Sequence, residues 1–436
     1  MRQLLFFAAL AVLLASPALR ADQGALAGQR HRVFVSTDVG GTDFDDFQSM
    51  VHVLLYADVL DIEGFISSPC GGPGRLEHLW KVIDLYATDY PKLRTYSARY
   101  PTPEALRAMS RQGETRTAPY AGVRAATAGS DWLVQCARRD DPRPLHVLIW
   151  GGIEDLAQAL HDAPDILPKL RVYYIGGPNK KWSPDAYHYI ATHHPKLWII
   201  ESNSTYYGWF VGGNQTGDLS AERFAEAHAA GRGALGEFFA HGISFEGQKR
   251  SSLKMGDTPS VAWLLRGDPA QPSQPGWGGR YVRAWARPHV RFERLTTAAD
   301  TIEQCGILEL MLPLGDNAPA QPEARMVIEN QSLVGHVAGD GTMRFRFCPK
   351  EAKLYRYTIR GNVPALQGRA GQITSTAPTL AQTLNPSPEL PNWWTDDPAA
   401  ALIESAHQGA RTINEWRADY LRDFAIRLER CRISKS

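Results

Sequence analysis

The segment from Ser36 to Asp46 constrains the fold of this chain more than any other, and it reads STDVGGTDFDD. The residues just before it, over 32–37, are β-branched and aromatic, which is typical of a short buried strand. A pair of glycines then lets the backbone turn sharply. Beyond the turn, apolar residues recur at helical spacing from Phe47 to Leu55. A strand, a tight loop and a helix in this order predict an α/β fold.

Four acids fall within this loop: Asp38, Asp43, Asp45 and Asp46. The predicted geometry puts Asp38 at the end of the strand and the other acids at the start of the helix, the edge where open α/β sheets bind ligands. Crowded carboxylates repel one another unless they share a cation or a proton, and carboxylate oxygens suit Ca²⁺ or Mg²⁺ better than Zn²⁺. The alternative is that Asp45 or Asp46 caps the helix while the other acids are solvated.

Further buried strands are predicted at 61–68, 145–150, 170–177 and 197–201, several of them followed by a glycine turn or a helix. This alternation implies an open, mostly parallel sheet. From about residue 299 the pattern changes to short alternating strands around Gly339-Asp340-Gly341, which predicts a hairpin and a small C-terminal β-sandwich. The expected divisions are a signal peptide at 1–21, an α/β domain at 30–298, the sandwich at 299–376, and a Pro- and Thr-rich linker with a terminal helix at 377–436, the helix running from about 399 to 430 and packing back on the α/β domain.

The acidic loop resembles a known motif. Asp38, Gly40 and the Asp45-Asp46 pair are similar to the calcium-binding amino-terminal motif of nucleoside hydrolases, the inosine/uridine-preferring superfamily. The stretch from TDVGG to DDFQSM more closely resembles nucleoside-hydrolase-like proteins that bacteria export and that were once labelled cellulose-binding. The resemblance covers most of 32–281.

The resemblance implies a Ca²⁺ ion held by Asp38, Asp45 or Asp46, Asp257 and a backbone carbonyl at Glu154. It also implies that Asp38 accepts a proton from the attacking water. Asp257 and Glu154 each have a second interpretation, because each stands where a helix begins and acids favour that end. Capping and ligation are compatible at Asp257, since one carboxylate oxygen can do each.

Sugar contacts are implied at Asn179, Asp185 and Tyr187, which follow the turn where the family places such residues. Each alone is also an ordinary turn residue. The aromatic run over 205–213 contains Tyr206 and Trp209, and it predicts either a mobile flap that stacks on a sugar or an aromatic plug over the core.

The function that follows is a calcium-dependent hydrolase that acts on N-glycosidic or related glycosidic bonds through a metal-activated water. Gly256 stands where nucleoside hydrolases have a histidine, so the candidates for protonating the leaving group are Tyr206, Tyr207 and Lys254, or no residue at all if the leaving group is acidic. The alternative is a non-catalytic, calcium-dependent carbohydrate-binding protein. The expected partner is a small-molecule or oligosaccharide glycoside, and a homo-oligomer is allowed. A purely structural role would leave the cluster of acids after the first strand, and Asp257, without an explanation.

The net charge, the amino-terminal segment and the cysteines further limit what kind of protein this can be. The net charge is +1 with acids and bases dispersed, so no surface for a nucleic acid polymer is indicated. Met1 to Ala21 has a basic start, an apolar core and small residues near its end, which predicts a cleaved signal peptide and a secreted or periplasmic protein. A membrane anchor is the alternative, but the apolar run is short. Of five cysteines, Cys305 and Cys348 are the pair expected to form a disulfide.

Overall fold

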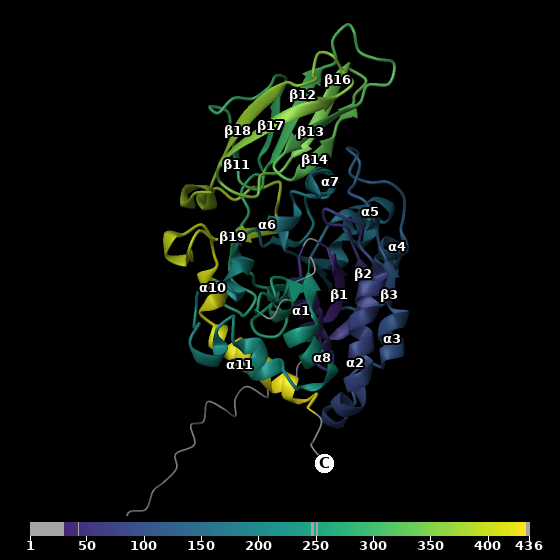
Figure 1. Ribbon diagram of the computed structural model, residues 1–436, viewed down its shortest axis with the longest axis vertical. Helices are drawn as coiled ribbons and strands as arrows, with labels where there is room; N and C mark the ends of the chain where they lie inside the picture. Colours follow the sequence, from purple (N-terminus) through teal and green to yellow (C-terminus); the bar gives the residue numbers. More distant parts are fainter. Residues whose placement is uncertain (1–29, 42, 246–247, 250–251, 433–436) are drawn as a thin grey trace, which may run out of the picture. The chain divides into compact units, whose positions relative to one another are not determined.

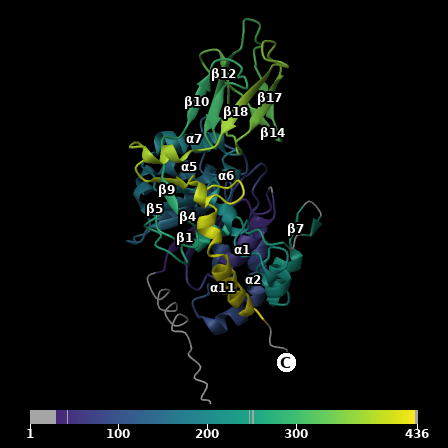
Figure 2. The same cartoon turned by 90° about the vertical axis from the view of Figure 1, so that its left-hand side faces the viewer.

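The computed structural model describes residues 30–41, 43–245, 248–249 and 252–432, and Figures 1 and 2 show it from two sides. The signal peptide expected at 1–21 lies outside the described residues. From His31 onward the chain forms one compact unit. Within the part that the structure describes, no helix is both long and apolar enough to cross a membrane.

An eight-stranded sheet forms the centre of the α/β part. Its strands run parallel except β9, which is antiparallel to β19. In spatial order the strands are β3 (Ser110–Gln112), β2 (Asp61–Ser67), β1 (Arg32–Thr37), β4 (Leu145–Ile149), β5 (Leu170–Tyr174), β6 (Ile199–Glu201), β19 (Trp393–Asp396) and β9 (Tyr281–Arg283). The predicted open, mostly parallel sheet is confirmed.

Helices cover both faces of this sheet, and two apolar clusters fill the space between helices and strands. The helices are α1 (Asp45–Leu55), α2 (Leu76–Tyr96), α3 (Pro103–Ala108), α4 (Ala128–Ala137), α5 (Glu154–Asp162), α6 (Gly176–Asn179), α7 (Pro184–His193), α8 (Gly233–Glu237), α9 (Thr258–Ala262), α10 (Arg411–Asn414) and α11 (Arg417–Glu429). A small hairpin joins β7 (Ser244–Phe245) to β8 (Gln248–Lys249).

The first helix, α1, is buried on every side, whereas its sequence pattern predicts a single apolar face. The C-terminal helix α11 accounts for part of the difference, because it contacts α1 and lies over it in Figure 2. Polar side chains of α1 therefore face protein instead of water. Gln48, Ser49 and His52 are each less than 2% exposed, and the first two hold a segment of the functional site.

Two sheets packed face to face form the predicted β-sandwich. One contains β10 (His289–Phe292), β12 (Ile307–Pro313), β16 (Thr342–Phe347) and β15 (His336–Val337), and the other contains β11 (Thr301–Glu303), β18 (Ala370–Thr376), β17 (Leu354–Gly361), β13 (Ala324–Ile328) and β14 (Gln331–Val334). One apolar cluster takes side chains from both sheets, so they share a core. The hairpin predicted at Gly339-Asp340-Gly341 joins β15 to β16, with Gly341 at a φ of 78°.

The C-terminal segment departs from the prediction in two ways. Residues Trp393–Asp396 form β19, which inserts between β6 and β9, so the segment after the sandwich completes the central sheet. The expected long helix from 399 to 430 is wrong at its start, because the regular helices begin only at Arg411. Ser405 and Gly409 have φ values of 55° and 72°, left-handed conformations that a continuous helix cannot contain.

All five cysteines are free and buried, so the disulfide predicted between Cys305 and Cys348 is absent. Both residues belong to the apolar cluster on one side of the central sheet. Burial raises the pKa of the Cys305 thiol to about 12, and it raises the pKa of Cys348 well above its usual value. Each cysteine therefore behaves as a small apolar core residue.

Candidate metal centre

Three carboxylates meet at the carboxyl edge of the central sheet. One oxygen from each of Asp45, Asp46 and Asp257 lies within 4.8 Å of the others. Asp45 and Asp46 form the first turn of α1, and Asp257 immediately precedes α9, more than 200 residues along the chain. All three are at most 6% exposed. The fold thus gathers acids from two distant segments in one buried place.

Side chains of α1 hold the segment that carries Asp257. The Gln48 amide oxygen accepts hydrogen bonds from the backbone N–H groups of Lys254 and Met255, at 2.9 and 3.0 Å, while its nitrogen donates to the carbonyl of Ser252 at 2.9 Å. Gly256 N–H donates to Asp45 Oδ2 at 2.8 Å. Gln48 is therefore a positioning residue, and no local sequence pattern indicates this role because its partners lie far along the chain.

Asp38 borders the three acids from the end of β1. Its charge is among those that raise the pKa of Asp46 and of Asp257. The loop after β4 packs directly against it, since a Cβ added at Gly151 would lie 2.7 Å from Asp38 Oδ1. Thr37, one residue earlier, donates a hydrogen bond to Asp46 Oδ1. Asp38, just after β1, and Asp46, in the first turn of α1, are thus neighbours in space.

Burial and mutual repulsion make these acids costly to ionise. Burial, followed by the charges of Asp43 and Asp45, raises the pKa of Asp38 to about 8. Burial and then neighbouring carboxylates raise the pKa values of Asp45, Asp46 and Asp257 well above the usual range. Such a group favours either protonation or a bound cation.

Lys254 supplies positive charge at one side of the cluster. Its ammonium binds Asp43 and lies 3.3 Å from Asp45 Oδ2. Burial raises the pKa of Asp43, but hydrogen bonds from Asp45 and Lys254 and the lysine charge outweigh it and lower that pKa to about 2. Asp43 is thereby satisfied within the protein, whereas Asp46 and Asp257 face one another.

The donor set fits a hard divalent cation. Asp257 Oδ2 is buried and has no hydrogen-bond partner among the described residues. An unpartnered carboxylate oxygen beside two further carboxylates is what a cation that prefers oxygen ligands requires. We conclude that Asp45, Asp46 and Asp257 could hold such an ion, with Asp38 beside it.

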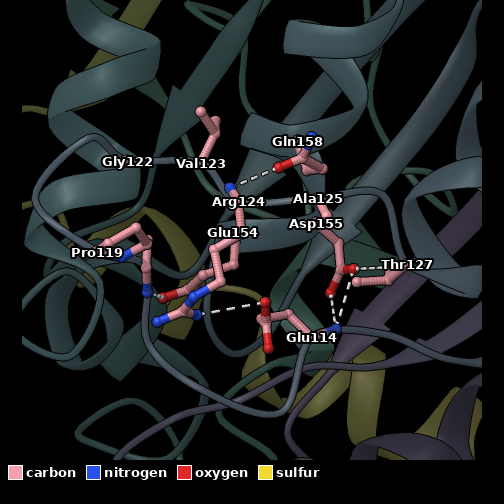
Figure 3. Close-up of a pocket in the computed structure, with 11 residues that line it drawn as sticks. Glu114, Pro119, Gly122, Val123, Arg124, Ala125, Thr127, Glu154, Asp155 and Gln158 are labelled. Atoms are coloured by element: carbon pink, nitrogen blue, oxygen red, sulfur yellow. Dashed lines mark hydrogen bonds and ion pairs between the residues drawn. The ribbon is translucent and has the colours of Figure 1, made fainter.

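The side chain of Glu154 serves a different purpose from its backbone. Its carboxylate accepts hydrogen bonds from Ser183 Oγ, at 2.8 and 2.9 Å, and from Ala118 N–H at 3.3 Å. Figure 3 shows it in a polar pocket with Asp155, whose carboxylate accepts from Glu114 N–H and Thr127 Oγ1. Burial raises the pKa of Glu154 to about 8. The two acids at the start of α5 thus fix the 114–127 loop, and the backbone carbonyl of Glu154 stays a predicted ligand.

Asn179 and Asp185 form hydrogen bonds within the protein, and Tyr187 is buried with no hydrogen-bond partner for its hydroxyl among the described residues. Asn179 donates to the carbonyls of Trp150 and Ile175, at 2.6 and 2.9 Å, and accepts from the Cys70 thiol at 3.1 Å. Asp185 accepts from Arg346 of the sandwich at 3.0 Å. Tyr187 is 1% exposed. Sugar contacts at these three residues stay a prediction.

The aromatic run over 205–213 takes the form of the plug and not of the flap. Thr205–Trp209 is a short 3-10 helix, Tyr206 is 4% exposed and Trp209 is fully buried. Trp209 stacks on Tyr420 of α11, with ring centroids 3.7 Å apart. The signal was ambiguous because glycines beside aromatics occur in both arrangements, and the covering helix lies 200 residues away.

Comparison with known proteins assigns the class. Residues 32–281, more than half of the chain, match the sequence model of the family described as "Cellulose-binding Sde182, nucleoside hydrolase-like domain". The chain therefore belongs to this nucleoside-hydrolase-like family, and the family predicted from the acidic loop is confirmed. No curated protein matches the chain.

Solved structures give distant likenesses. A nucleoside hydrolase-related hypothetical protein from Saccharophagus degradans, associated with carbohydrate metabolism, is 19% identical with a TM-score of 0.49, over 80% of this chain and 100% of that one. An inosine-uridine preferring nucleoside hydrolase from Bacillus anthracis is 16% identical with a TM-score of 0.35, over 59% and 87%. A purine-preferring ribonucleoside hydrolase from Gardnerella vaginalis is 11% identical with a TM-score of 0.39, over 91% and 99%.

Proposed function

We propose that this protein is an exported, calcium-dependent hydrolase of N-glycosidic or related glycosidic bonds. The observation that carries the proposal is the group of buried acids at the end of β1, where Asp45, Asp46 and Asp257 converge and Asp257 keeps an unpartnered oxygen. Membership in a nucleoside-hydrolase-like family supports the reaction class. The signal-peptide pattern of Met1 to Ala21 supports export.

Asp45, Asp46 and Asp257 would hold the ion, together with Asp38 and the backbone carbonyl of Glu154. When bound, calcium supplies positive charge that keeps the carboxylates ionised and acidifies a nearby water. Ionised Asp38 accepts a proton from the attacking water, whose oxygen bonds to the anomeric carbon as the glycosidic bond breaks. The remaining carboxylates stabilise the positive charge that develops on the sugar.

The leaving group takes a proton as the bond breaks. Burial raises the pKa of Tyr206 well above its usual value, which makes it a weak acid. Burial lowers the pKa of Lys254, but the charges of Asp45 and Asp43 outweigh burial and raise it, so the lysine retains its proton. Tyr207 is partly exposed and stacks on His407, with ring centroids 3.6 Å apart. Tyr206, Tyr207 and Lys254 stay the candidates, and a leaving group that is itself acidic needs none of them.

The second candidate function is calcium-dependent carbohydrate binding without turnover. The description of the family as cellulose-binding favours it, and the acids would then bind a cation that chelates sugar hydroxyls. A buried base such as Asp38 is more than diol binding needs, which favours the enzyme.

Release of reducing sugar distinguishes the two. We expect the mature protein to release sugar from at least one member of a panel of nucleosides and glycosides, with activity lost on chelation and restored by Ca²⁺. Asp45→Asn should lower turnover by roughly two orders of magnitude or more, on the scale of losing one group that stabilises the transition state. Asp131→Asn, an exposed acid on α4, is the matched control. Full chelator-sensitive turnover by Asp45→Asn would overturn the assignment, and binding without turnover would favour the second candidate.

A further inference from the structure

A cavity of about 530 Å³ lies where the α/β part meets the β-sandwich. Its α/β wall includes Gly71, Tyr120 and Trp182, and its sandwich wall includes Arg346 and the residues from Asn330 to His336. The volume is within the range of about 300–1,000 Å³ that small-molecule sites occupy. We call it the junction cleft.

Two buried polar atoms in the wall of the junction cleft lack partners. Gln331 is 4% exposed; its nitrogen donates to the carbonyl of Lys181 at 2.6 Å, but its Oε1 has no partner in the described chain. Arg346 is 8% exposed, and its Nε is likewise without one. The Gln331 oxygen needs a hydrogen-bond donor and the Arg346 nitrogen needs an acceptor, and leaving a buried polar atom unsatisfied is unfavourable. A hydroxyl group can serve both, because it donates and accepts.

The charges in the wall point to a neutral ligand. Arg346 binds Asp185 at 3.0 Å and Glu309 at 3.2 Å, and Arg124 lies 3.4 Å from Glu114. Burial and the charges of Arg344 and Arg346 lower the pKa of His336, which keeps its ring neutral at pH 7. The arginines described in the wall thus already have carboxylate partners. An anionic ligand would have to compete with those carboxylates.

Trp182 gives the wall an aromatic surface beside these hydrogen-bonding groups. It is partly exposed, and its backbone N–H donates to the carbonyl of Asn179 at 3.0 Å, which anchors it just before α7. A sugar ring has an apolar face and a rim of hydroxyls, so it matches an aromatic ring bordered by unpartnered polar atoms.

Two residues in the wall of the junction cleft, Gly71 and Ser183, link it to the surroundings of the candidate metal centre. Gly71 lines the cleft and follows Cys70, and burial together with the nearby Asp38 charge raises the pKa of the Cys70 thiol. On the other side, Ser183 lines the cleft and donates to Glu154. One loop therefore contributes both to the surroundings of Asp38 and to the cleft wall.

We propose that the junction cleft, through Gln331, Arg346 and Trp182, binds a neutral oligosaccharide. The inference rests on the proposed function in one respect, namely that the bound sugar chain is the part of the substrate beyond the bond that is cut. The β-sandwich would then supply half of a substrate site instead of acting as a separate module.

Calorimetric titration of the calcium-loaded protein with cellohexaose and xylohexaose tests the proposal. We expect at least one of them to bind, and Trp182→Ala to weaken its binding tenfold or more. Trp80→Ala, which removes an exposed tryptophan of α2 outside the cleft, should bind as the wild type does. Ser332→Cys carrying a bulky maleimide covers the case in which Trp182→Ala fails to fold. Ser332 is exposed in the cleft wall, and the five natural cysteines are buried.

Three results would overturn the proposal: no binding of either hexasaccharide, equal binding by wild type, Trp182→Ala and the labelled Ser332→Cys, or preference for an oligogalacturonide. Failure of the proposed function gives a different result. Hexasaccharide binding with no turnover of any glycoside would overturn only the hydrolase, whereas turnover of small glycosides without hexasaccharide binding would overturn only the cleft assignment.

Discussion

Glu309 on β12 and Asp257 before α9 are both buried carboxylates, and they differ in their partners. Glu309 is fully buried and accepts from His289 at 3.0 Å and Arg291 at 2.9 Å, with Arg346 at 3.2 Å. Burial raises its pKa, but hydrogen bonds with His289 and Tyr120 and the charge of Arg346 outweigh burial and lower the pKa below its usual value. Asp257 faces Asp45 and Asp46 instead, and its pKa is raised by burial and their charges.

The difference separates a structural acid from a functional one. At Glu309 the protein supplies the cations, so the ionised carboxylate is satisfied and binds the sandwich to the α/β part through Arg346. At Asp257 the protein supplies further acids, so the group is satisfied only by a proton or by an ion from outside. Burial alone therefore does not mark a site, whereas burial without a counter-charge does.

Removing one carboxylate from each region should have opposite effects on stability. Glu309→Gln removes one of the two carboxylates that contact buried Arg346, leaving only Asp185, and we expect it to lower the free energy of unfolding by roughly 1–3 kcal/mol. Asp257→Asn removes mutual repulsion, so in chelator at pH 8 it should raise the unfolding midpoint. Urea denaturation followed by intrinsic fluorescence measures both. If both substitutions destabilise the calcium-free protein equally, Asp257 does not differ from Glu309 in the way described above.

Gln48→Ala should weaken the proposed calcium site without removing a ligand. Gln48 holds the segment before Asp257 through three hydrogen bonds to backbone groups, and losing such support typically costs roughly 10–100-fold in metal affinity. Calcium titration by calorimetry measures the loss. Gln304→Ala is the control, since Gln304 makes a comparable bond, 2.7 Å to the carbonyl of Lys350, in the sandwich. Equal affinity for calcium in Gln48→Ala and wild type would show that the segment before Asp257 keeps its position without the hydrogen bonds of Gln48.

The smallest expected effect is in the dependence of stability on pH. In calcium-free protein Asp38 keeps its proton up to about pH 8, whereas the unfolded chain loses it near pH 4. The folded state then binds more protons between these values, so its stability falls as pH rises from about 4 to about 8. We expect the melting temperature in chelator to drop by roughly 2 °C or more over this interval, relative to calcium-loaded protein. Parallel melting curves with and without calcium would contradict the assignment.

The elements of the α/β part could be predicted from the sequence because their signals are local. The strand before Asp38, the glycine turn and the helix after Asp45 lie within one short segment, and each has its own pattern of apolar residues. Asp257 could be singled out only through the family resemblance, since nothing near it in the chain indicates acids from another helix.

The parts that escaped prediction depend on contacts far along the chain. Gln48 has no motif, and its role exists only once residues 252–256 pack against α1. Trp209 reads equally well as a flap or a plug until α11 covers it. The strand β19 has only four residues, too few for a periodic pattern, and its place is set by the open edges of β6 and β9.

The position of β19 between β6 and β9 implies an order in which the central sheet can be completed. β9 comes before the sandwich and β19 after it, so the sandwich is an insertion between two neighbouring strands of one sheet. During synthesis, β6 gains its last neighbour only after the whole sandwich has been made. A chain stopped anywhere before Trp393 would leave an unpaired sheet edge, a template for aggregation. That edge of β6 is thus covered only after the ribosome has passed the sandwich.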